Sequence, residues 1–248
     1  MLIQTQQHSE KMLNTALAAV ALIEEPERNA TNVAHSLHRW VSGTHTKKAI
    51  LHKRSQTLAH KLDTAFSLAN VDERALALVL SLAFPDRIAQ QRVNQYGRFT
   101  LSNGHGAECR PEETLGGCDY LVAIDLMRSH SNSSQINLAC DLDINALQET
   151  FDHLFTVTEL VDWDEKKGRL IAERQIKLGQ LVIKREALPS PGKEKMTQAL
   201  LTYVRRQGLQ SLNWTPAAEN LLERIRCAVE WLPAVSYTHL RAHETHEN

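Results

Sequence analysis

Clustered cations without acidic neighbours are the strongest chemical signal in this sequence of 248 residues. Between Glu27 and Asp63 there is no acidic residue at all. The same interval holds these basic residues and histidines: Arg28, Arg39, Lys47, Lys48, Lys53, Arg54 and Lys61, with His35, His38, His45, His52 and His60. Attraction of phosphates requires clustered cations of this kind. The pattern indicates a nucleic-acid-binding surface, and the alternative is a solvated basic helix face.

A second cationic group lies further along the chain, next to aromatic residues. It consists of Arg87, Arg92 and Arg98, with Tyr96 and Phe99 close by. Small barrels bind single strands by stacking bases on exposed aromatic rings beside a basic groove. The group fits such a surface, and its alternative is a set of solvated cations with aromatic residues in the core.

Familiar catalytic motifs are missing from the sequence. It has no G-x-x-x-x-G-K-[S/T] loop, no G-x-S-x-G elbow and no His-Glu-x-x-His. The glycines in residues 103–106 are typical of a hairpin turn. Asp162, Asp164 and Glu165 precede a Lys-Lys-Gly turn, which favours a solvated hairpin end over a pair of catalytic carboxylates. We therefore predict no catalytic residue in this chain.

Metal-ligand patterns are weak. His35 and His38 share one helix face but lack a nearby third ligand. The cysteines form no Cys-x-x-Cys pair, and we expect reduced, mostly buried thiols. The prediction is that no metal is bound, and a metal-dependent enzyme built on His35, His38 and Cys109 is kept as an alternative.

The composition is that of an ordinary globular chain. Its formal charge is −1, with 23% charged and 42% apolar residues. No apolar run reaches the ~18–20 residues of a membrane crossing, and the first residues lack the apolar core of a signal peptide. We expect a cytoplasmic protein without a membrane partner, built as one large domain or two to three small ones.

The first domain, residues 1–84, is predicted to be a helical bundle. Apolar residues recur at three- and four-residue spacing throughout residues 10–84, in four segments. Asp72 is the expected N-cap of the fourth helix, and Pro85 ends it. Because residues 73–83 are apolar at nearly every position, we expect this helix to be the most buried one.

The second domain, residues 85–189, is predicted to be a small OB-like antiparallel barrel, with a sandwich as the alternative. One short helix, residues 144–153 with Asp143 as its N-cap, interrupts the strands. Short segments rich in β-branched and aromatic residues alternate with turn signals. The expected strands are residues 98–102, 120–126, 135–139, 155–161, 169–176 and 180–184.

The remaining chain is predicted to be a helical pair followed by a tail. A linker at residues 189–192 introduces residues 190–233, in which the first helix ends at Gly208 and the second begins at Thr215-Pro216. Residues 234–248 continue no pattern, and we interpret them as a non-native tail. The expected fold class is α+β.

A set of short motifs resembles one protein family. In chain order they are Phe84-Pro85-Asp86-Arg87-Ile88-Ala89, Gly97-Arg98-Phe99, residues 101–107, Val161-Asp162-Trp163-Asp164, residues 178–181, residues 212–216 and Trp231-Leu232-Pro233. Together they resemble the C-terminal region of HrpB-type bacterial DEAH-box RNA helicases. Residues 10–70 fit the helical region of that family more by pattern than by motif.

The resemblance implies a place within a longer, NTP-driven RNA helicase. This chain then matches the ratchet-like bundle, the OB-like barrel and the start of the family-specific C-terminal part. ATP and magnesium belong to the motor domains of such a protein, whose phosphate loop and Asp-Glu-Ala-His box are not in this sequence. The implied partners are single-stranded RNA and those motor domains, and this chain is not expected to hydrolyse ATP by itself.

The same arrangement suggests which side chains contact RNA. We assign phosphate contacts in this order: Arg87, Arg92 and Arg98, then Lys53 and Arg54. Phe99 is the candidate for base stacking, although strand alternation favours the core for its ring. Arg87 has a competing structural role, in which it pairs with Asp86 or with acids of the bundle.

A rival hypothesis assigns the chain a different partner. In it, the chain is a protein-interaction module that docks on the helicase motor domains without touching RNA. The basic segment then faces an acidic protein surface.

Overall fold

The computed structural model describes residues 10–28, 30–128, 133–208 and 211–231. The predicted tail at residues 234–248 lies outside the described residues. The chain divides into two compact units: unit 1 is Met1–Glu159 with Arg174–Glu186, and unit 2 is Leu160–Glu173 with Ala187–Asn248. Unit 1 combines helices with a small barrel, which confirms the α+β class.

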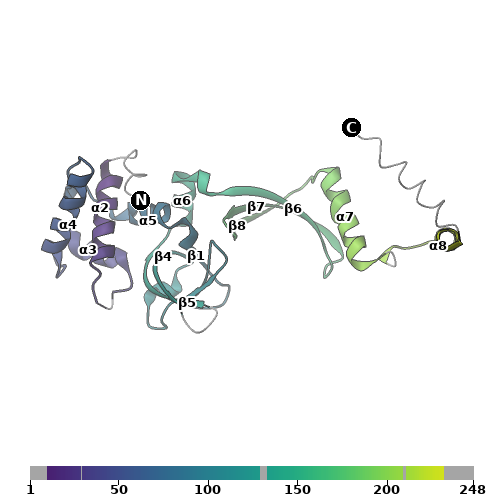
Figure 1. The fold of residues 1–248 in the computed structure, drawn as a ribbon, viewed down its shortest axis with the longest axis horizontal. Helices are drawn as coiled ribbons and strands as arrows, with labels where there is room; N and C mark the ends of the chain where they lie inside the picture. Colours follow the sequence, from purple (N-terminus) through teal and green to yellow (C-terminus); the bar gives the residue numbers. More distant parts are fainter. Residues whose placement is uncertain (1–9, 29, 129–132, 209–210, 232–248) are drawn as a thin grey trace. The chain divides into compact units, whose positions relative to one another are not determined.

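The four predicted helices of the first domain are present. The fourth begins as a 3-10 turn, η2, in which the Asp72 side chain accepts a hydrogen bond from the Arg74 N–H, and it ends before Pro85 as predicted. Figure 1 shows α3 and α4 beside α2. The elements are α2 (Glu10–Glu24), α3 (Val33–Val41), α4 (Lys48–Lys61), η1 (Leu68–Asn70), η2 (Glu73–Ala75) and α5 (Leu76–Ala83).

The most buried of these helices is α2, and the prediction that the fourth helix would be was wrong. Nine of the fifteen residues of α2 are buried, against four of the eight in α5. The reason is the small side chains of α2, among them Ala16, Ala18 and Ala19, which are 0% exposed. Alanine lets neighbouring helices approach closely, so α2 packs against α3, α4 and α5 at once.

Five strands close the barrel in the order β1-β2-β3-β5-β4, and β1 pairs with β4 to complete the circle (Figure 1). All neighbours are antiparallel except β3 and β5. Five strands are the number in an OB-fold, and the OB-like assignment itself stays a prediction. The elements are η3 (Pro85–Arg87), β1 (Ile88–Gln91), β2 (Arg98–Leu101), β3 (Gly106–Glu108), η4 (Thr114–Gly117), β4 (Tyr120–Arg128), β5 (Ser133–Asp141), α6 (Ile144–Thr150) and η5 (Asp152–Leu154).

The barrel uses different strands from those expected. The last three predicted strands form a separate three-stranded sheet of order β6-β7-β8 instead of closing the barrel. Their places are taken by β1 and β3, which have only four and three residues. Such short segments, with glutamines in one and a glycine in the other, give no periodic signal in a sequence. The separate sheet consists of β6 (Thr156–Asp164), β7 (Arg169–Leu178) and β8 (Leu181–Ala187).

The helical bundle and the barrel share one hydrophobic core. A single cluster of buried side chains includes Trp40 of α3, Leu80 of α5 and Val122 of β4. The backbones also meet, because the Ala139 N–H of β5 donates a 2.8 Å hydrogen bond to the Thr31 carbonyl. The predicted boundary at residue 84 therefore falls inside one compact unit.

Unit 2 contains the distal parts of β6 and β7 and two helices, α7 (Lys193–Gln207) and α8 (Pro216–Trp231). The Trp163 and Tyr203 rings lie 5.0 Å apart, and Arg206 donates a 2.9 Å hydrogen bond to Asp162. The predicted helix end at Gly208 has φ +82°. Within the described residues, no helix has both the length and the apolar character of a membrane span.

Candidate nucleic-acid interface

The hairpin of β1 and β2 presents two of the predicted arginines to solvent. Arg92 and Arg98 are both exposed, and the Arg92 N–H donates a 2.8 Å hydrogen bond to the Arg98 carbonyl. The Arg92 guanidinium also donates to Thr100 Oγ1 at 3.1 Å. Arg98 stands opposite Glu108 of β3 in the register of the sheet, so one acid lies near this pair of cations. The structure thus places Arg92 and Arg98 side by side at the edge of the barrel.

Tyr96, in the loop of the same hairpin, has the exposed aromatic ring of this region. The residue is 62% exposed, and its hydroxyl donates a 3.1 Å hydrogen bond to the Glu113 carbonyl. The sequence grouped Tyr96 with the arginines, but Phe99 was the residue predicted to stack a base. The position of Tyr96 in a loop between two strands, with no alternating neighbours to bury it, was the available signal.

Two other residues predicted to contact RNA are instead held within the protein. Phe99 is 0% exposed in the barrel core, so its ring offers no surface to a base and we remove it from the candidate site. Arg87 is half-buried: its guanidinium donates a 2.6 Å hydrogen bond to the Ile124 carbonyl and lies 5.2 Å from the centroid of the Phe84 ring. Arg87 therefore connects the end of α5 to β4. This is the structural role that competed with RNA binding, but its partners are the Ile124 carbonyl and the Phe84 ring instead of acidic residues.

The predicted cations of the bundle lie apart from the hairpin. Figure 1 shows α4 on the side of α2 away from the barrel, and both Lys53 and Arg54 belong to α4. Arg54 forms an ion pair with Glu24, whereas the exposed side chain of Lys53 has no hydrogen bond or ion pair with any residue that the structure describes. The structure does not join these cations to Arg92 and Arg98 in one cluster.

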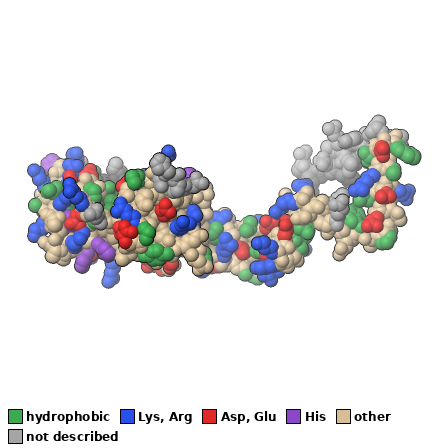
Figure 2. Space-filling view, turned by 90° about the horizontal axis from the view of Figure 1, so that it is seen from below, with side chains coloured by type: hydrophobic (Ala, Val, Ile, Leu, Met, Phe, Trp, Pro, Cys, Tyr) green, Lys and Arg blue, Asp and Glu red, His purple; other side chains and the backbone are tan. Residues whose placement is uncertain are grey.

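Acids from α2 and the segment after it neutralise part of the basic surface. Figure 2 shows lysine, arginine and histidine side chains gathered over the helical end of unit 1 with acidic side chains among them. Besides Arg54, ion pairs connect Arg39 to Glu27 and Lys47 to Glu25. The interval without acids in the sequence is thus not an unbroken cationic surface in space.

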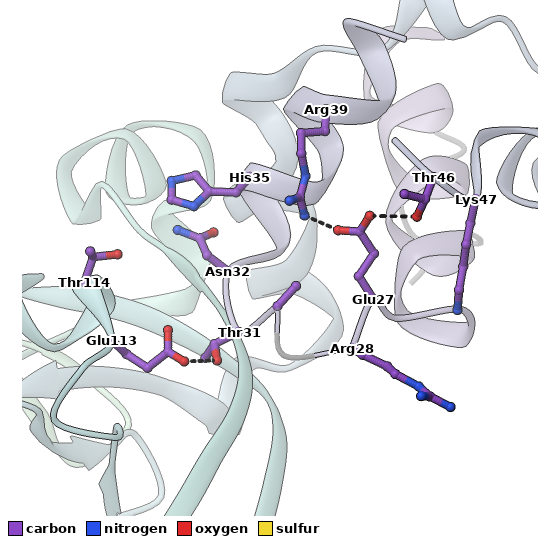
Figure 3. Close-up of a pocket in the computed structure, with 11 residues that line it drawn as sticks. Glu27, Arg28, Thr31, Asn32, His35, Arg39, Thr46, Lys47, Glu113 and Thr114 are labelled. Atoms are coloured by element: carbon purple, nitrogen blue, oxygen red, sulfur yellow. Dashed lines mark hydrogen bonds and ion pairs between the residues drawn. The ribbon is translucent and has the colours of Figure 1, made fainter. Parts of the chain in front are cut away.

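A cavity of about 780 Å³ lies where the helical segment meets the barrel. Figure 3 shows the Glu27 carboxylate held between Arg39 and Thr46, whose hydroxyl donates at 3.3 Å. On the barrel side, the Glu113 carboxylate accepts a 2.5 Å hydrogen bond from the Thr31 hydroxyl. Both carboxylates of the cavity are therefore held in place by partners within the protein.

Two other polar side chains of this cavity, Asn32 and His35, are turned toward the η4 turn. In Figure 3 the Asn32 and His35 side chains extend toward Thr114, while Arg28 extends away from them. The Asn32 side-chain oxygen caps α3 by accepting from the Ala34 N–H, and its amide nitrogen has no hydrogen-bond partner among the described residues. An amide, an imidazole and a hydroxyl can bind neutral hydrogen-bonding groups such as a ribose or a base edge.

His45 is a buried histidine next to Glu27. Its side chain is 0% exposed, and Nε2 lies 3.2 Å from Glu27 Oε1 without the geometry of a hydrogen bond. Nδ1 accepts a 3.0 Å hydrogen bond from the Lys47 N–H, so the neutral ring carries its proton on Nε2. Burial lowers the pKa of His45; Glu27 opposes this effect, while Arg39 and Lys47 add to it. His45 is therefore neutral in the folded protein at pH 7.

Acid is expected to destabilise unit 1 through His45. Because its pKa in the folded state lies below the ordinary value of 6.5, the unfolded chain binds a proton first as the pH falls. The contribution is intact well above pH 6.5 and is lost as the pH drops through that value toward the lower pKa of the folded state. The urea midpoint should therefore decrease more between pH about 7.5 and pH about 5.5 in the original protein than in His45→Gln. The glutamine keeps a side-chain acceptor for the Lys47 N–H. An equal fall in both proteins would contradict this role.

The residues of the metal-enzyme alternative are not brought together. His38 pairs with Glu73 on the bundle at 3.0 Å, whereas Cys109 is buried in the barrel, where burial raises its pKa to about 11. Among the described residues, no three histidine, cysteine, aspartate or glutamate side chains lie close enough to hold a metal ion. The acidic residues considered as paired catalytic carboxylates lie before a turn, as expected. Asp164 accepts hydrogen bonds from the backbone N–H groups of Lys166 and Lys167 in that turn.

A small closed barrel that carries arginines and an exposed ring on one hairpin is typical of proteins that bind single-stranded nucleic acids. A family model described as "ATP-dependent RNA helicase HrpB, connector region" matches residues 154–188, the segment of the three-stranded sheet. The ATP-dependent RNA helicase HrpB of Escherichia coli K12 is 36% identical over 225 residues, which cover 88% of this chain and 26% of that protein.

Solved structures agree with the sequence comparison. A crystal structure of the E. coli DExH-box NTPase HrpB has a TM-score of 0.68 and 32% identity, covering 98% of this chain and 30% of that one. A crystal structure of the E. coli DEAH/RHA helicase HrpB has a TM-score of 0.61 and 30% identity, covering 96% of this chain and 30% of that one. The chain belongs to the HrpB family and corresponds to a C-terminal region of it, as the motifs predicted. It spans about a quarter of the length of the curated relative.

Proposed function

We propose that this chain is an accessory region of an HrpB-type helicase that guides single-stranded RNA beside the motor domains of the longer protein. The matched relatives are named as an RNA helicase and as an NTPase. This sequence has no phosphate loop, so we assign ATP, magnesium and hydrolysis to the motor domains. The region supplies a fixed, positively charged surface that limits backward movement of the RNA while the motor domains bind and release the strand.

The observation that carries this proposal is the hairpin of β1 and β2. It exposes Arg92 and Arg98 together, on a backbone fixed by hydrogen bonds to each other and to the barrel. Contacts between these cations and phosphates release counterions without reading the base sequence. The predicted binding is therefore weak, dependent on salt and independent of base identity.

Reversing both charges is the direct test. In the double variant Arg92→Glu/Arg98→Glu, we expect affinity for single-stranded RNA to fall and the slope of log K against log salt to shrink by about 1.4, since each lost contact removes roughly 0.7. The measurement is fluorescence anisotropy with a labelled oligouridine over a salt series. Arg87 is left unchanged, because it holds η3 against β4.

A double reversal elsewhere in unit 1 provides the control. Arg174 and Arg185 are exposed on β7 and β8, so Arg174→Glu/Arg185→Glu changes the net charge equally. Equal losses in the two double variants would show a general charge effect and contradict the assigned site. A folded original protein that retains no RNA at low salt would overturn the proposal. That result would favour the rival hypothesis, in which the chain docks on the helicase motor domains without touching RNA. The exposed Leu221, Ile225 and Trp231 of α8 offer a surface for such docking.

A further inference from the structure

We propose that Tyr96 is a base-stacking platform for the RNA strand, an inference that rests on the proposed function. Tyr96 is an aromatic residue that the barrel exposes by 62% beside the two hairpin arginines. Stacking of a base on such a ring is worth about 1–3 kcal/mol and tolerates any base, because every base has a π-face. The platform would thus add affinity to the phosphate contacts without adding sequence preference.

The Tyr96 ring lies next to two successive glycines. A Cβ atom added at Gly116 would lie 2.7 Å from Tyr96 Cε1, and one added at Gly117 would lie 3.6 Å from Cε2. Ring carbons on both edges therefore lie close to the Gly116-Gly117 backbone, and the residue is nonetheless 62% exposed. A side chain at Gly116 would displace the ring, whereas one at Gly117 would make an ordinary contact with it.

The loop that carries Tyr96 is fixed before any ligand arrives. The Tyr96 hydroxyl is anchored on the Glu113 carbonyl, and the Gly97 N–H donates a 3.0 Å hydrogen bond to the Gly116 carbonyl. Gly97 has φ +71°, and its carbonyl accepts a 2.8 Å hydrogen bond from the N–H of Cys109, which directly follows β3. A ring held this firmly loses little entropy when a base stacks on it, which is the advantage of a pre-organised site.

The surroundings of the ring indicate the path of the strand. Arg92 and Arg98, which suit phosphates, belong to the hairpin that carries Tyr96. The Tyr96 hydroxyl meets the backbone of Glu113, whose side chain lines the polar cavity of about 780 Å³. The Glu113 carboxylate repels phosphates but accepts hydrogen bonds from amino and hydroxyl groups. The strand therefore runs with its phosphates over the arginines and its next base or ribose toward the cavity.

The test separates base contacts from phosphate contacts. The probes are a labelled oligouridine of about 12 nucleotides and an abasic ribose-phosphate oligomer of equal length, both at about 50 mM salt. Tyr96→Leu should weaken binding of the oligouridine about 5- to 150-fold and leave binding of the abasic oligomer unchanged. Tyr96→Phe keeps the ring but loses the hydroxyl anchor, so it should weaken binding of the oligouridine less than Tyr96→Leu does and leave binding of the abasic oligomer unchanged. Val93→Ala, at an 85% exposed position in the same loop, should bind both probes like the original protein.

Each outcome addresses one of the two proposals. If the original protein binds both probes and Tyr96→Leu binds the oligouridine equally well, the platform is wrong and the phosphate contacts stand. In a second outcome, Tyr96→Leu binds both probes more weakly to the same extent while its urea midpoint is unchanged. The ring then only positions the arginines, and the platform is again wrong. If the original protein binds neither probe, the proposed function fails, and the platform fails with it.

Discussion

Replacing Leu80 with alanine is expected to lower the free energy of unfolding of the bundle and the barrel together by about 3 kcal/mol, within the usual range for buried leucines. Leu80 is 0% exposed on α5 and belongs to the buried cluster that contains Trp40 and Val122. The cavity left by the deletion is therefore lined by residues of both parts. Because helices and strands lose the same contacts, they should unfold in one transition.

Hydrogen exchange in urea can follow both parts at once. Backbone amides of α2 and of β4 report on the bundle and the barrel, and Leu80→Ala should lower their protection by the same free energy. Val93→Ala removes apolar atoms at an 85% exposed position and should change stability by less than about 0.5 kcal/mol. If α2 loses protection while β4 keeps it, the two parts are separate folding units.

The local features of this fold were readable from the sequence because their causes are local. Asp143 was expected to cap α6, and its carboxylate accepts from the Asn145 and Ala146 N–H groups at 2.9 and 3.2 Å. Thr215 was expected to cap α8, and its hydroxyl accepts from the Ala218 N–H. Each of these contacts spans no more than three residues, so the residue types alone specify it.

Features that depend on residues distant in the sequence could not be predicted in the same way. The interval without acids appeared uniformly basic, but Glu24 and Glu27 reach into it from the end of α2 and beyond. The inclusion of β1 and β3 in the barrel likewise depended on their pairing with β2, β4 and β5, because neither short segment has a periodic pattern of its own. Neither the fold of a neighbouring helix nor the pairing of a short strand is encoded in local spacing.

Gly179→Ala is expected to release the turn between β7 and β8 from the barrel. Gly179 has φ +57°, and a Cβ atom there would collide with the Ser102 carbonyl oxygen and lie 3.1 Å from its carbon. The left-handed backbone costs an alanine about 1–2 kcal/mol, and a forced contact with the backbone adds about 1–3 kcal/mol. The expected loss is therefore about 3 kcal/mol, and it includes the 2.8 Å hydrogen bond from the Gln180 N–H to the Ser102 carbonyl.

Gly168→Ala separates the two causes of this loss. Gly168 turns the chain between β6 and β7 with φ +59°, nearly the same value, but an added Cβ would have no atom within 4 Å. It should lose only the backbone contribution of about 1–2 kcal/mol. Hydrogen exchange of the amides that flank each turn measures both losses. Equal losses would mean that the barrel yields to the extra methyl group, and the buried Leu178 and Leu181 would then hold the turn without the close approach of the two backbones.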